Sequence, residues 1–294
     1  MKTHISPAAS FQLEEVSLRD GLQREAVWPV AAKMKLVELL YAAGVRRMEV
    51  GSLVNPKVVP ALANTMELLS CLAQKRTADP HFADLQISVL LPRAASFLAV
   101  AASGVDQVAV AISRDEDFQQ KNWHNSISQA QTEIAQIFDL RQQKFPQVRI
   151  KAYLMMAWIK ERPLEQDRFL LDFLQGLADE VCLADTAAAA EEENFLANLT
   201  AAAAVIPCDR LSLHLHGKAE EVLRLGQMAA QFGIRKFDTA LGGLGGCPFL
   251  ALPAANADTR LFNQMLRNFA PHQGGEIQDE GLAAAERFLQ EMMR

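Results

Sequence analysis

The sequence predicts an α/β fold, a single (β/α)₈ TIM barrel with an extra C-terminal helix, and three observations support this fold class. Short β-rich runs alternate with longer helical runs along the 294 residues. These units recur roughly every 30–40 residues, and a barrel of this kind typically needs about 250 residues. Glycine followed by a β-branched residue precedes three strands, where a helix-to-strand turn needs it: Gly44-Val45, Gly104-Val105 and Gly233-Ile234.

The candidate strands are apolar in runs, as expected for a parallel sheet that helices cover. In chain order they are Phe11–Leu18, Arg46–Gly51, Leu85–Leu91, Gln107–Ile112, Val148–Met156, Glu180–Ala184, Leu211–His216 and Lys236–Ala240. Between them, apolar residues recur at the spacing of a helix that buries one face. These helical stretches include Leu36–Ala43, Met66–Leu72, Ile127–Phe138, Phe169–Leu177 and Val222–Phe232.

Two further stretches predict helices in the second half of the chain. Ala187–Ala190 and Ala201–Ala204 flank three glutamates at 191–193, which is typical of a helix with an acidic first turn. Apolar residues between Leu282 and Met292 indicate a final helix in an extension of about 270–294, which we expect to pack under the barrel or on a partner subunit. No Gly/Ser- or Pro-rich linker divides the chain, so residues 1–294 are expected to form one domain.

Composition excludes several classes of protein. Half of the residues are hydrophobic and 22% are charged, as in ordinary soluble proteins. The net charge of -6 argues against nucleic-acid binding. No apolar run reaches the roughly 18 residues of a membrane span, and the first residues have no signal-peptide pattern. Four scattered cysteines indicate a reduced, cytoplasmic protein: Cys71, Cys182, Cys208 and Cys247.

Polar residues that could carry chemistry gather at one end of the predicted barrel. Active sites of such barrels lie at the carboxyl ends of the strands. The residues that follow or end strands one, two, six and seven are Asp20, Glu49, Asp185, His214 and His216. A glycine-rich loop of about 241–248, which carries Cys247, follows the eighth strand. We therefore expect one site at this end.

His214 and His216 are two residues apart on a predicted strand, so their imidazoles would point to the same face. Together with oxygens from Asp20 and Asn256 they would form an open site for a divalent metal, Mg²⁺ or Mn²⁺ in preference to zinc. The alternative is a pair of hydrogen-bonded histidines in a buried strand. Arg19 could turn away from Asp20 and stabilise a developing enolate oxygen, and its alternative is a surface salt bridge.

Three other predictions concern supporting groups. Cys247 stands among glycines in a loop that could close over a ligand, so its thiol could act as a general acid or base; alternatively it is an inert buried cysteine. Asp185 could hold a substrate hydroxyl or cap a helix. Glu49 and Tyr153 could support Arg19 and the catalytic base by hydrogen bonds, although single residues of these types are more often structural.

Ten short motifs together identify a family. They are Arg19–Gln23, Met48–Ser52, Asn55–Lys57, Val59-Pro60, Asp117-Phe118, Lys121-Asn122, Asn125–Ile127, Asp185-Thr186, His214–His216 and Gly243–Pro248. On these residues the chain resembles the 3-hydroxy-3-methylglutaryl-CoA (HMG-CoA) lyases, metal-dependent TIM-barrel enzymes related to isopropylmalate and homocitrate synthases. The glycine–cysteine loop is characteristic of the lyases. The resemblance runs from about Leu13 to about Leu266.

The resemblance implies a retro-Claisen cleavage of HMG-CoA to acetoacetate and acetyl-CoA, a step of leucine degradation and ketone-body formation. It implies metal ligation by Asp20, His214, His216 and Asn256. It also implies that Arg19 stabilises the enolate, with Glu49 as its orienting partner. Cys247 would be the mobile acid or base, and Asp185 and Tyr153 would stand near the acyl-CoA substrate. Lys57 and Lys121-Asn122 are candidates for contacts with CoA, and a homodimer is expected.

Three segments depart from the family pattern. Gly217 stands where the family has aspartate, Ala187–Ala190 replace a glycine-containing run, and Trp158 lies where a Gly-Cys-Pro turn is usual. We expect the segments 157–161 and 187–190 to surround the acyl end of the pocket. Alternatives to the HMG-CoA lyase are therefore a lyase for a related 3-hydroxyacyl-CoA such as a citramalyl thioester, a condensing acyltransferase that joins acetyl-CoA to a 2-oxoacid, or an inactive scaffold protein.

Overall fold

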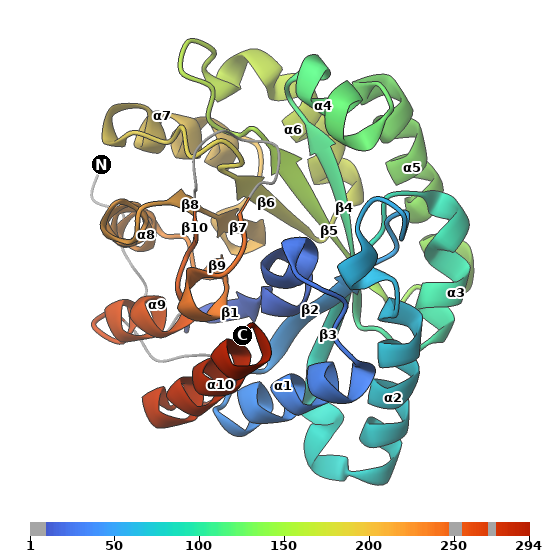
Figure 1. Cartoon of the computed structure of the whole chain (residues 1–294). Coiled ribbons are helices and arrows are strands. Elements are labelled where there is room, and N and C mark those ends of the chain that lie inside the picture. The colour runs from blue at the N-terminus through green and yellow to red at the C-terminus, as the bar shows by residue number, and fades with distance from the viewer. Residues whose placement is uncertain (1–9, 247–254, 270–274) are drawn as a thin grey trace.

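The computed structural model describes residues 10–246, 255–269 and 275–294, which form a closed β-barrel inside a ring of helices (Figure 1). Eight of the described strands are parallel and pair in the order β1-β2-β3-β4-β5-β6-β7-β9, and β9 closes the barrel on β1. The predicted (β/α)₈ fold is confirmed. Within the described ranges, no helix combines the length and apolar character needed to cross a membrane.

Each predicted strand run overlaps one strand of the barrel. The strands are β1 (Gln12–Glu15), β2 (Arg47–Ser52), β3 (Gln86–Leu90), β4 (Gln107–Ser113), β5 (Arg149–Met155), β6 (Glu180–Ala184), β7 (Leu211–His214) and β9 (Lys236–Thr239). A separate antiparallel pair joins β8 (His216–Gly217) to β10 (Ala255–Asn256). The helices are α1 (Val30–Ala42), α2 (Thr65–Ala78), α3 (Phe97–Ala102), α4 (Glu116–Trp123), α5 (Ile127–Lys144), α6 (Arg168–Leu177), α7 (Glu192–Ala203), α8 (Ala219–Phe232), α9 (Thr259–Leu266) and α10 (Asp279–Met292).

The predicted helix-to-strand turns have the backbone that glycine favours. Gly44, Gly104 and Gly233 have φ angles of 98°, 84° and 123°, which other residues rarely adopt. Gly44 follows the end of α1 and its C-cap residue, as predicted. Each of these glycines lets the chain leave a helix and enter the next parallel strand, so the repeated glycine pairs in the sequence did mark the repeat of the fold.

Two predicted strands are too long. β1 ends at Glu15, because the amides of Arg19, Asp20 and Gly21 all donate to the carbonyl of Val16 and wind residues 17–21 into a wide helical turn. The run Leu211–His216 also breaks. β7 ends at His214, and His216 instead pairs with Asn256 across the β8–β10 ladder.

One predicted helical region begins later than expected. The carboxylate of Asp185 accepts the amides of Ala189 and Ala190, which holds residues 187–190 in a turn, and Ala188 has a φ of 50°. The helix α7 therefore starts at Glu192, with its acidic first turn as predicted. The final helix starts at Asp279, and it packs against α1 (Figure 1). At this contact a Cβ on Gly281 would lie 2.7 Å from Ala43 Cα.

The barrel strands alternate between a helix-facing side and a lumen-facing side, as the pleat of a strand requires. Helix-facing residues such as Leu13, Val108 and Leu213 belong to the main apolar core. Lumen-facing residues are polar at the amino ends of the strands, where Lys151 Nζ lies 2.8 Å from Glu14 Oε2 and 2.5 Å from Asp238 Oδ1. The strands that read as apolar runs in the sequence therefore also carry charged side chains, which point into the barrel lumen.

Candidate active site

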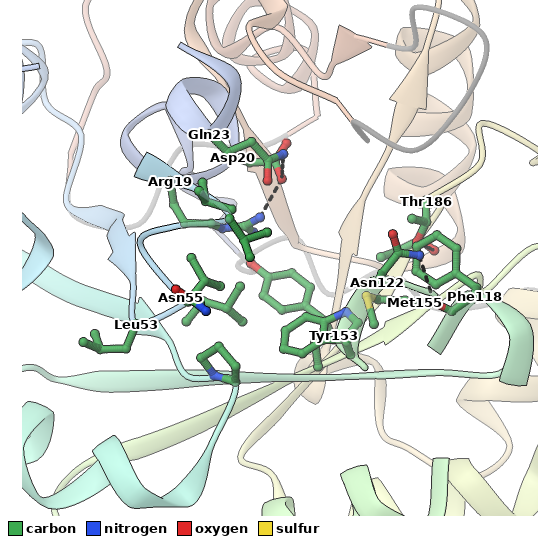
Figure 2. A pocket seen from close by; sticks show the side chains of 18 of the residues that line it. Arg19, Asp20, Gln23, Leu53, Asn55, Phe118, Asn122, Tyr153, Met155 and Thr186 are labelled. Atoms are coloured by element: carbon green, nitrogen blue, oxygen red, sulfur yellow. Dashed lines mark hydrogen bonds and ion pairs between the residues drawn. The ribbon is translucent and has the colours of Figure 1, made fainter. Parts of the chain in front are cut away.

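A cavity of about 460 Å³ opens at the carboxyl ends of the barrel strands, where the sequence predicted the site. Residues at or near the carboxyl ends of strands line it, namely Leu90, Ala111, Tyr153, Met155, Ala184 and His214. Figure 2 shows Arg19, Asp20 and Gln23 on one side, Met155 and Thr186 on the other, and the Tyr153 ring between them. The cavity therefore lies between the first strand's loop and the middle of the barrel.

The turn after β1 brings Arg19 and Asp20 to the cavity wall. Asp20 Oδ1 lies 2.5 Å from Arg19 Nη1, and Arg19 Nε forms a second ion pair with Glu49 Oε1. The expected divergence of Arg19 and Asp20 is thus wrong, because Asp20 itself holds one edge of the guanidinium. Burial alone would raise the pKa of Asp20, but the positive charge of Arg19 keeps that pKa well below its usual value.

His214 and His216 meet although they lie on different strands. Their Nε2 atoms are 3.0 Å apart, and His216 Nε2 is 3.1 Å from Asn256 Oδ1. The antiparallel pairing of His216 with Asn256 positions both side chains. Asn256 Nδ2 donates to Asp20 Oδ2 at 2.7 Å. The four residues that the family resemblance implied as metal ligands therefore lie together.

The donor atoms of this cluster fit a divalent metal ion. One ligand atom each from Asp20, His214 and His216 lies within 4.8 Å of the other two, and all three side chains are buried. Two imidazole nitrogens with carboxylate and amide oxygens make a site for an ion such as Mg²⁺ or Mn²⁺ that keeps open positions for substrate. The Nε2 atoms of both histidines, the Asn256 amide oxygen and the Asp20 carboxylate thus lie close together, an arrangement that a bound cation would satisfy.

Asp238, on β9, is a site residue that the sequence analysis missed. Its Oδ2 lies 3.2 Å from His214 Nδ1. Burial would raise the pKa of Asp238, but the adjacent Lys151 lowers it, so the carboxylate is charged and accepts the Nδ1 proton. His214 Nε2 is then free of a proton and can bind a metal. The signal was a single acidic residue in an otherwise β-forming run, Lys236–Ala240.

Glu49 and Tyr153 lie beneath Arg19. Glu49 is fully buried, and burial raises the pKa of its carboxyl group. The hydroxyl of Tyr153 lies 3.0 Å from Glu49 Oε2, and the Arg19 guanidinium lies 5.5 Å from the centre of the Tyr153 ring. Both residues are therefore placed to support Arg19, as the sequence analysis expected, and Tyr153 also lines the cavity.

Asp185 lies beside the cavity but does not line it, whereas its neighbour Thr186 does. The Asp185 carboxylate holds the turn after β6, and burial raises its pKa to about 6. The altered segment around Trp158 is also away from the cavity, because the Trp158 ring is fully buried and stacks on Phe195 with ring centres 5.2 Å apart. The expectation that segments 157–161 and 187–190 surround the acyl end is wrong.

The glycine-rich loop approaches the metal cluster closely. A Cβ on Gly245 would lie 2.6 Å from Asp20 O and 2.8 Å from Asn256 Nδ2, so only glycine fits there. The amide of Gly246 donates to Asp20 Oδ2 at 3.4 Å, and Gln23 Nε2 donates to Gly246 O at 3.4 Å. Cys247, the residue predicted as an acid or base, lies outside the described residues.

Comparisons with known proteins agree with this geometry. A family model described as HMGL-like matches residues 10–272. The chain is 30% identical over 282 residues to the 3-hydroxy-3-isohexenylglutaryl-CoA/hydroxy-methylglutaryl-CoA lyase of Pseudomonas aeruginosa, which covers 90% of this chain and 88% of that protein. It is also 30% identical over 252 residues to the (R)-citramalyl-CoA lyase of Chloroflexus aurantiacus, covering 82% and 78%.

A solved structure supports the same assignment. The HMG-CoA lyase of Brucella melitensis has a TM-score of 0.85 to this structure, with 27% sequence identity, and the match covers 97% of this chain and 99% of that one. The matched part of the sequence includes the barrel strands, the loop after β1 and the β8–β10 pair that brings Asn256 to His216. Because the family model spans most of its residues, the chain belongs to the HMGL-like family.

Proposed function

We propose that this protein is a divalent-metal-dependent carbon–carbon lyase that cleaves HMG-CoA into acetoacetate and acetyl-CoA. One observation carries the proposal: ligand atoms of Asp20, His214 and His216 converge within 4.8 Å beside Arg19 in a single cavity. The relatives named above are, by their names, lyases of 3-hydroxyacyl-CoA thioesters. The reaction needs a group that polarises a hydroxyl and a fixed cation for an enolate, and this cavity holds residues for both.

The residues that we assign to the metal are Asp20, His214, His216 and Asn256. When bound, Mg²⁺ or Mn²⁺ would act as a Lewis acid toward the C3 hydroxyl of the substrate and as a template that orients it. Asp238 keeps His214 Nε2 available for this ion. Arg19 neutralises part of the charge of Asp20 and, with Glu49, fixes the position of that carboxylate.

Arg19 is assigned to the enolate oxygen. A guanidinium has five N–H donors, and its contacts with Glu49 and Asp20 engage Nε and Nη1. Donors therefore remain for a substrate oxygen in the cavity that Arg19 lines. Because both ion pairs are made by side chains of the protein itself, they hold the guanidinium in place while negative charge develops on the substrate. A donor fixed in this way contributes about 3 kcal/mol to transition-state stabilisation.

The bond changes follow from these assignments. The C3 hydroxyl gives its proton to a general base, the C2–C3 bond breaks, and the electron pair of that bond moves into the enolate of acetyl-CoA while C3 becomes the ketone of acetoacetate. Protonation of the enolate carbon completes the reaction. We assign the acid to Cys247, since its sequence neighbour Gly246 donates to Asp20 Oδ2 and so brings the loop to the metal cluster.

Asn122 is the group that we assign to the thioester arm. It lines the cavity, and its Nδ2 donates to Phe118 O at 2.8 Å. Its Oδ1 is buried and has no hydrogen-bond partner among the described residues. That atom is free to accept an amide N–H of the pantetheine chain. Lys57 and Lys121 remain predictions for contacts with the CoA phosphates.

A lyase for a related 3-hydroxyacyl-CoA, such as a citramalyl thioester, is the second candidate. The observation that favours it is that the Chloroflexus relative is as similar in sequence as the Pseudomonas one, at 30% identity. Both candidates use the same metal cluster and the same Arg19, and they differ only in the acid product. We also retain the cytoplasm and a homodimer as predictions; the free thiols of Cys71, Cys182 and Cys208 are what a reducing compartment maintains.

The experiment is to incubate the protein with Mg²⁺ or Mn²⁺ and HMG-CoA and to detect acetoacetate and acetyl-CoA by mass spectrometry. We expect Arg19→Ala to lower kcat by about 10²–10³-fold and Cys247→Ala to lose most activity. Cys208→Ala is the matched thiol control, and Arg168→Ala, which removes an exposed arginine paired to Asp172, controls for loss of a cation. A citramalyl-CoA sample run in parallel separates the two substrates. Cleavage of neither thioester by metal-loaded protein would refute the proposal.

A further inference from the structure

A fully buried lysine lies in the barrel lumen beneath the metal cluster, and the proposed mechanism does not use it. Lys151, on β5, has no exposed surface. Its Nζ lies 2.5 Å from Asp238 Oδ1, 2.8 Å from Glu14 Oε2 and 3.7 Å from Glu180 Oε1. The ammonium group therefore sits among three carboxylates from three other strands, and the closest of these belongs to the residue that contacts His214.

Asp238 is held through both of its carboxylate oxygens. Oδ1 receives Lys151 Nζ, while Oδ2 faces His214 Nδ1 at 3.2 Å and the Tyr153 hydroxyl at 2.7 Å. Among the described residues, Lys151 is the hydrogen-bond donor to Oδ1. Contacts on both oxygens fix the plane of a carboxylate, which otherwise turns about its Cβ–Cγ bond. The orientation of Oδ2 toward His214 thus depends on Lys151 and Tyr153.

Tyr153 extends this arrangement to Arg19. Its hydroxyl lies between Asp238 Oδ2 at 2.7 Å and Glu49 Oε2 at 3.0 Å, and with a single proton it donates to one of them at a time. Glu49 in turn forms the ion pair with Arg19. A continuous chain of polar contacts therefore joins a proposed metal ligand, His214, to the proposed enolate-binding group, through Asp238, Tyr153 and Glu49.

We propose that Lys151 and Asp238 are positioning residues that fix the ring and the tautomer of His214, and that the Tyr153 hydroxyl couples this pair to Arg19. Neither Lys151 nor Asp238 lines the cavity, so each acts through another residue. The inference deepens the proposed function and rests on its metal site. Carboxylates that hold the second nitrogen of a metal-bound histidine typically change metal affinity by 10–100-fold when they are removed.

Binding of Mn²⁺ alone, measured as free Mn²⁺ by electron paramagnetic resonance, tests the proposal without substrate. We expect Asp238→Asn to weaken Mn²⁺ binding by about 10–100-fold, because an amide in this position can donate to Nδ1 and force the proton onto Nε2. Tyr153→Phe, which removes one hydroxyl and keeps the ring, should weaken binding about threefold. Nitrogen NMR of the histidine rings reports the tautomer directly, and His214 should carry its proton on Nδ1 only while Asp238 is present.

Glu14→Gln is the matched control. Glu14 is buried and its Oε2 lies 2.8 Å from Lys151 Nζ, but its other contacts among the described residues are with Ser88, Gln107 and Arg47, not with His214. This variant should lower the melting temperature and leave Mn²⁺ affinity and the His214 tautomer unchanged. Equal loss of affinity in Glu14→Gln and Asp238→Asn would overturn the inference, because general damage to the lumen would then explain both.

Lys151 is tested by Lys151→Met, which should bind Mn²⁺ at least threefold more weakly. If this variant does not fold, the double variant Lys151→Met/Glu14→Gln is used, because it removes one buried charge of each sign. Its Mn²⁺ affinity is then compared with that of Glu14→Gln alone. Affinity equal to that of the reference protein overturns the role of Lys151.

If the variants lose Mn²⁺ but the wild type cleaves no thioester, the inference stands and the proposed function fails. If the wild type cleaves HMG-CoA and Asp238→Asn binds Mn²⁺ normally, the proposed function stands and the inference fails.

Discussion

The barrel lumen contains two buried polar clusters, and they differ in how their charges are satisfied. The floor cluster lies at the amino ends of the strands and consists of Glu14, Arg47, Lys151, Glu180 and Lys236. Its ion pairs include Lys151 with Glu14 at 2.8 Å and Lys236 with Glu180 at 3.1 Å. Each carboxylate there has at least one cation within 4.0 Å, so every negative charge of the floor cluster is paired.

The mouth cluster lies at the opposite ends of the strands and consists of Asp20, His214, His216 and Asn256. Here two imidazole nitrogens face each other at 3.0 Å, with an amide oxygen 3.1 Å from one of them. Polar atoms that converge in this way, with the Asp20 carboxylate among them, are costly to bury unless hydrogen bonds or a cation satisfy them. The comparison teaches that buried charge alone does not mark a functional site. Apart from Lys151, which also contacts Asp238, the floor cluster serves the fold, and the mouth cluster has the composition of a site that needs a ligand.

The largest expected effect comes from breaking the mouth cluster with His216→Ala. A lost ligand should weaken Mn²⁺ binding by more than about 100-fold, the upper range for residues that only support a ligand, and lyase activity should fall with it. The melting temperature of the metal-free protein should change by no more than about 4 °C, because His216 lines a cavity and closes no ion pair of the floor cluster. Calorimetry measures the Mn²⁺ affinity and the melting temperature, and an activity assay measures thioester cleavage. Full Mn²⁺ affinity in the variant would contradict the assignment.

Breaking the floor cluster should have the opposite outcome. Glu180→Gln removes the carboxylate that Arg47 and Lys236 contact at 3.5 Å and 3.1 Å, which leaves Lys236 without its carboxylate partner among the described residues and Arg47 with Glu14 at 3.6 Å. We expect a loss of about 3 kcal/mol in the free energy of unfolding and unchanged Mn²⁺ affinity. Urea denaturation and Mn²⁺ titration of the same sample separate the two effects. A stable variant that binds Mn²⁺ poorly would reverse the roles of the two clusters.

The floor cluster also predicts a pH dependence. Burial alone would raise the pKa of Glu180, but Lys151, Arg47 and Lys236 lower it from 4.5 to about 2. A lowered pKa contributes stability that is present above pH 4.5 and is lost as the pH falls toward 2, because the proton binds the unfolded chain more tightly. The difference in stability between wild type and Glu180→Gln should therefore shrink over this range. A stability difference between wild type and Glu180→Gln that does not change with pH would show that the shape of the Glu180 side chain, and not its charge, stabilises the fold.

Glu15 is a buried carboxylate with no ion pair among the described residues, and it sharpens the comparison. Glu15 accepts hydrogen bonds from Thr259 Oγ1 and the amide of Ser17, and burial raises its pKa from 4.5 to about 7. A raised pKa gives stability that is full below pH 4.5 and is lost as the pH rises through 7. Glu15→Gln should thus gain about 2 kcal/mol relative to wild type between pH 5 and pH 8. Chemical denaturation at several pH values measures this gain, and a constant difference would exclude a titrating Glu15.

The smallest expected effect is at the edge of the mouth cluster. Gly217 has a φ of 153°, and a Cβ there would lie 3.1 Å from Val222 Cγ2. We expect Gly217→Ala to cost about 1 kcal/mol of stability and to leave Mn²⁺ affinity unchanged, because Gly217 offers no side chain to the cluster. Thermal denaturation with and without Mn²⁺ tests this. A large loss of affinity would mean that backbone strain at this position sets the geometry of His216.

Much of the site could be predicted because of one property of parallel barrels. Their strands all end at the same rim, so polar residues just after strands one and seven had to come close. Asp20, His214 and His216 were found in this way, and the arrangement of Glu49 and Tyr153 around Arg19 also matches the expectation. Asn256 was grouped with them as an oxygen donor, and the family resemblance implied the same ligand. The catalytic roles of these residues remain proposals that the variants above test.

Other features could not be predicted from local sequence. The break between His214 and His216 depends on the short strand at Asn256, which lies 40 residues away in the chain. The turn at 187–190 depends on the Asp185 carboxylate, which captures amides that a helix would otherwise use. Trp158 was expected near the substrate, but its ring is drawn into the apolar core beside Phe195. In each case a tertiary contact outweighed the local pattern.

The sequence by itself determined the barrel, its repeat and the rim on which the site lies, because helical periodicity, strand runs and turn glycines are local properties of the chain. Only the tertiary structure decided that Lys151 and Asp238 meet across the lumen and that Asp238 holds His214. Those contacts depend on which face of each strand points inward and on the register between strands that are distant in sequence. A one-residue shift in either would have turned the same side chains toward the helices.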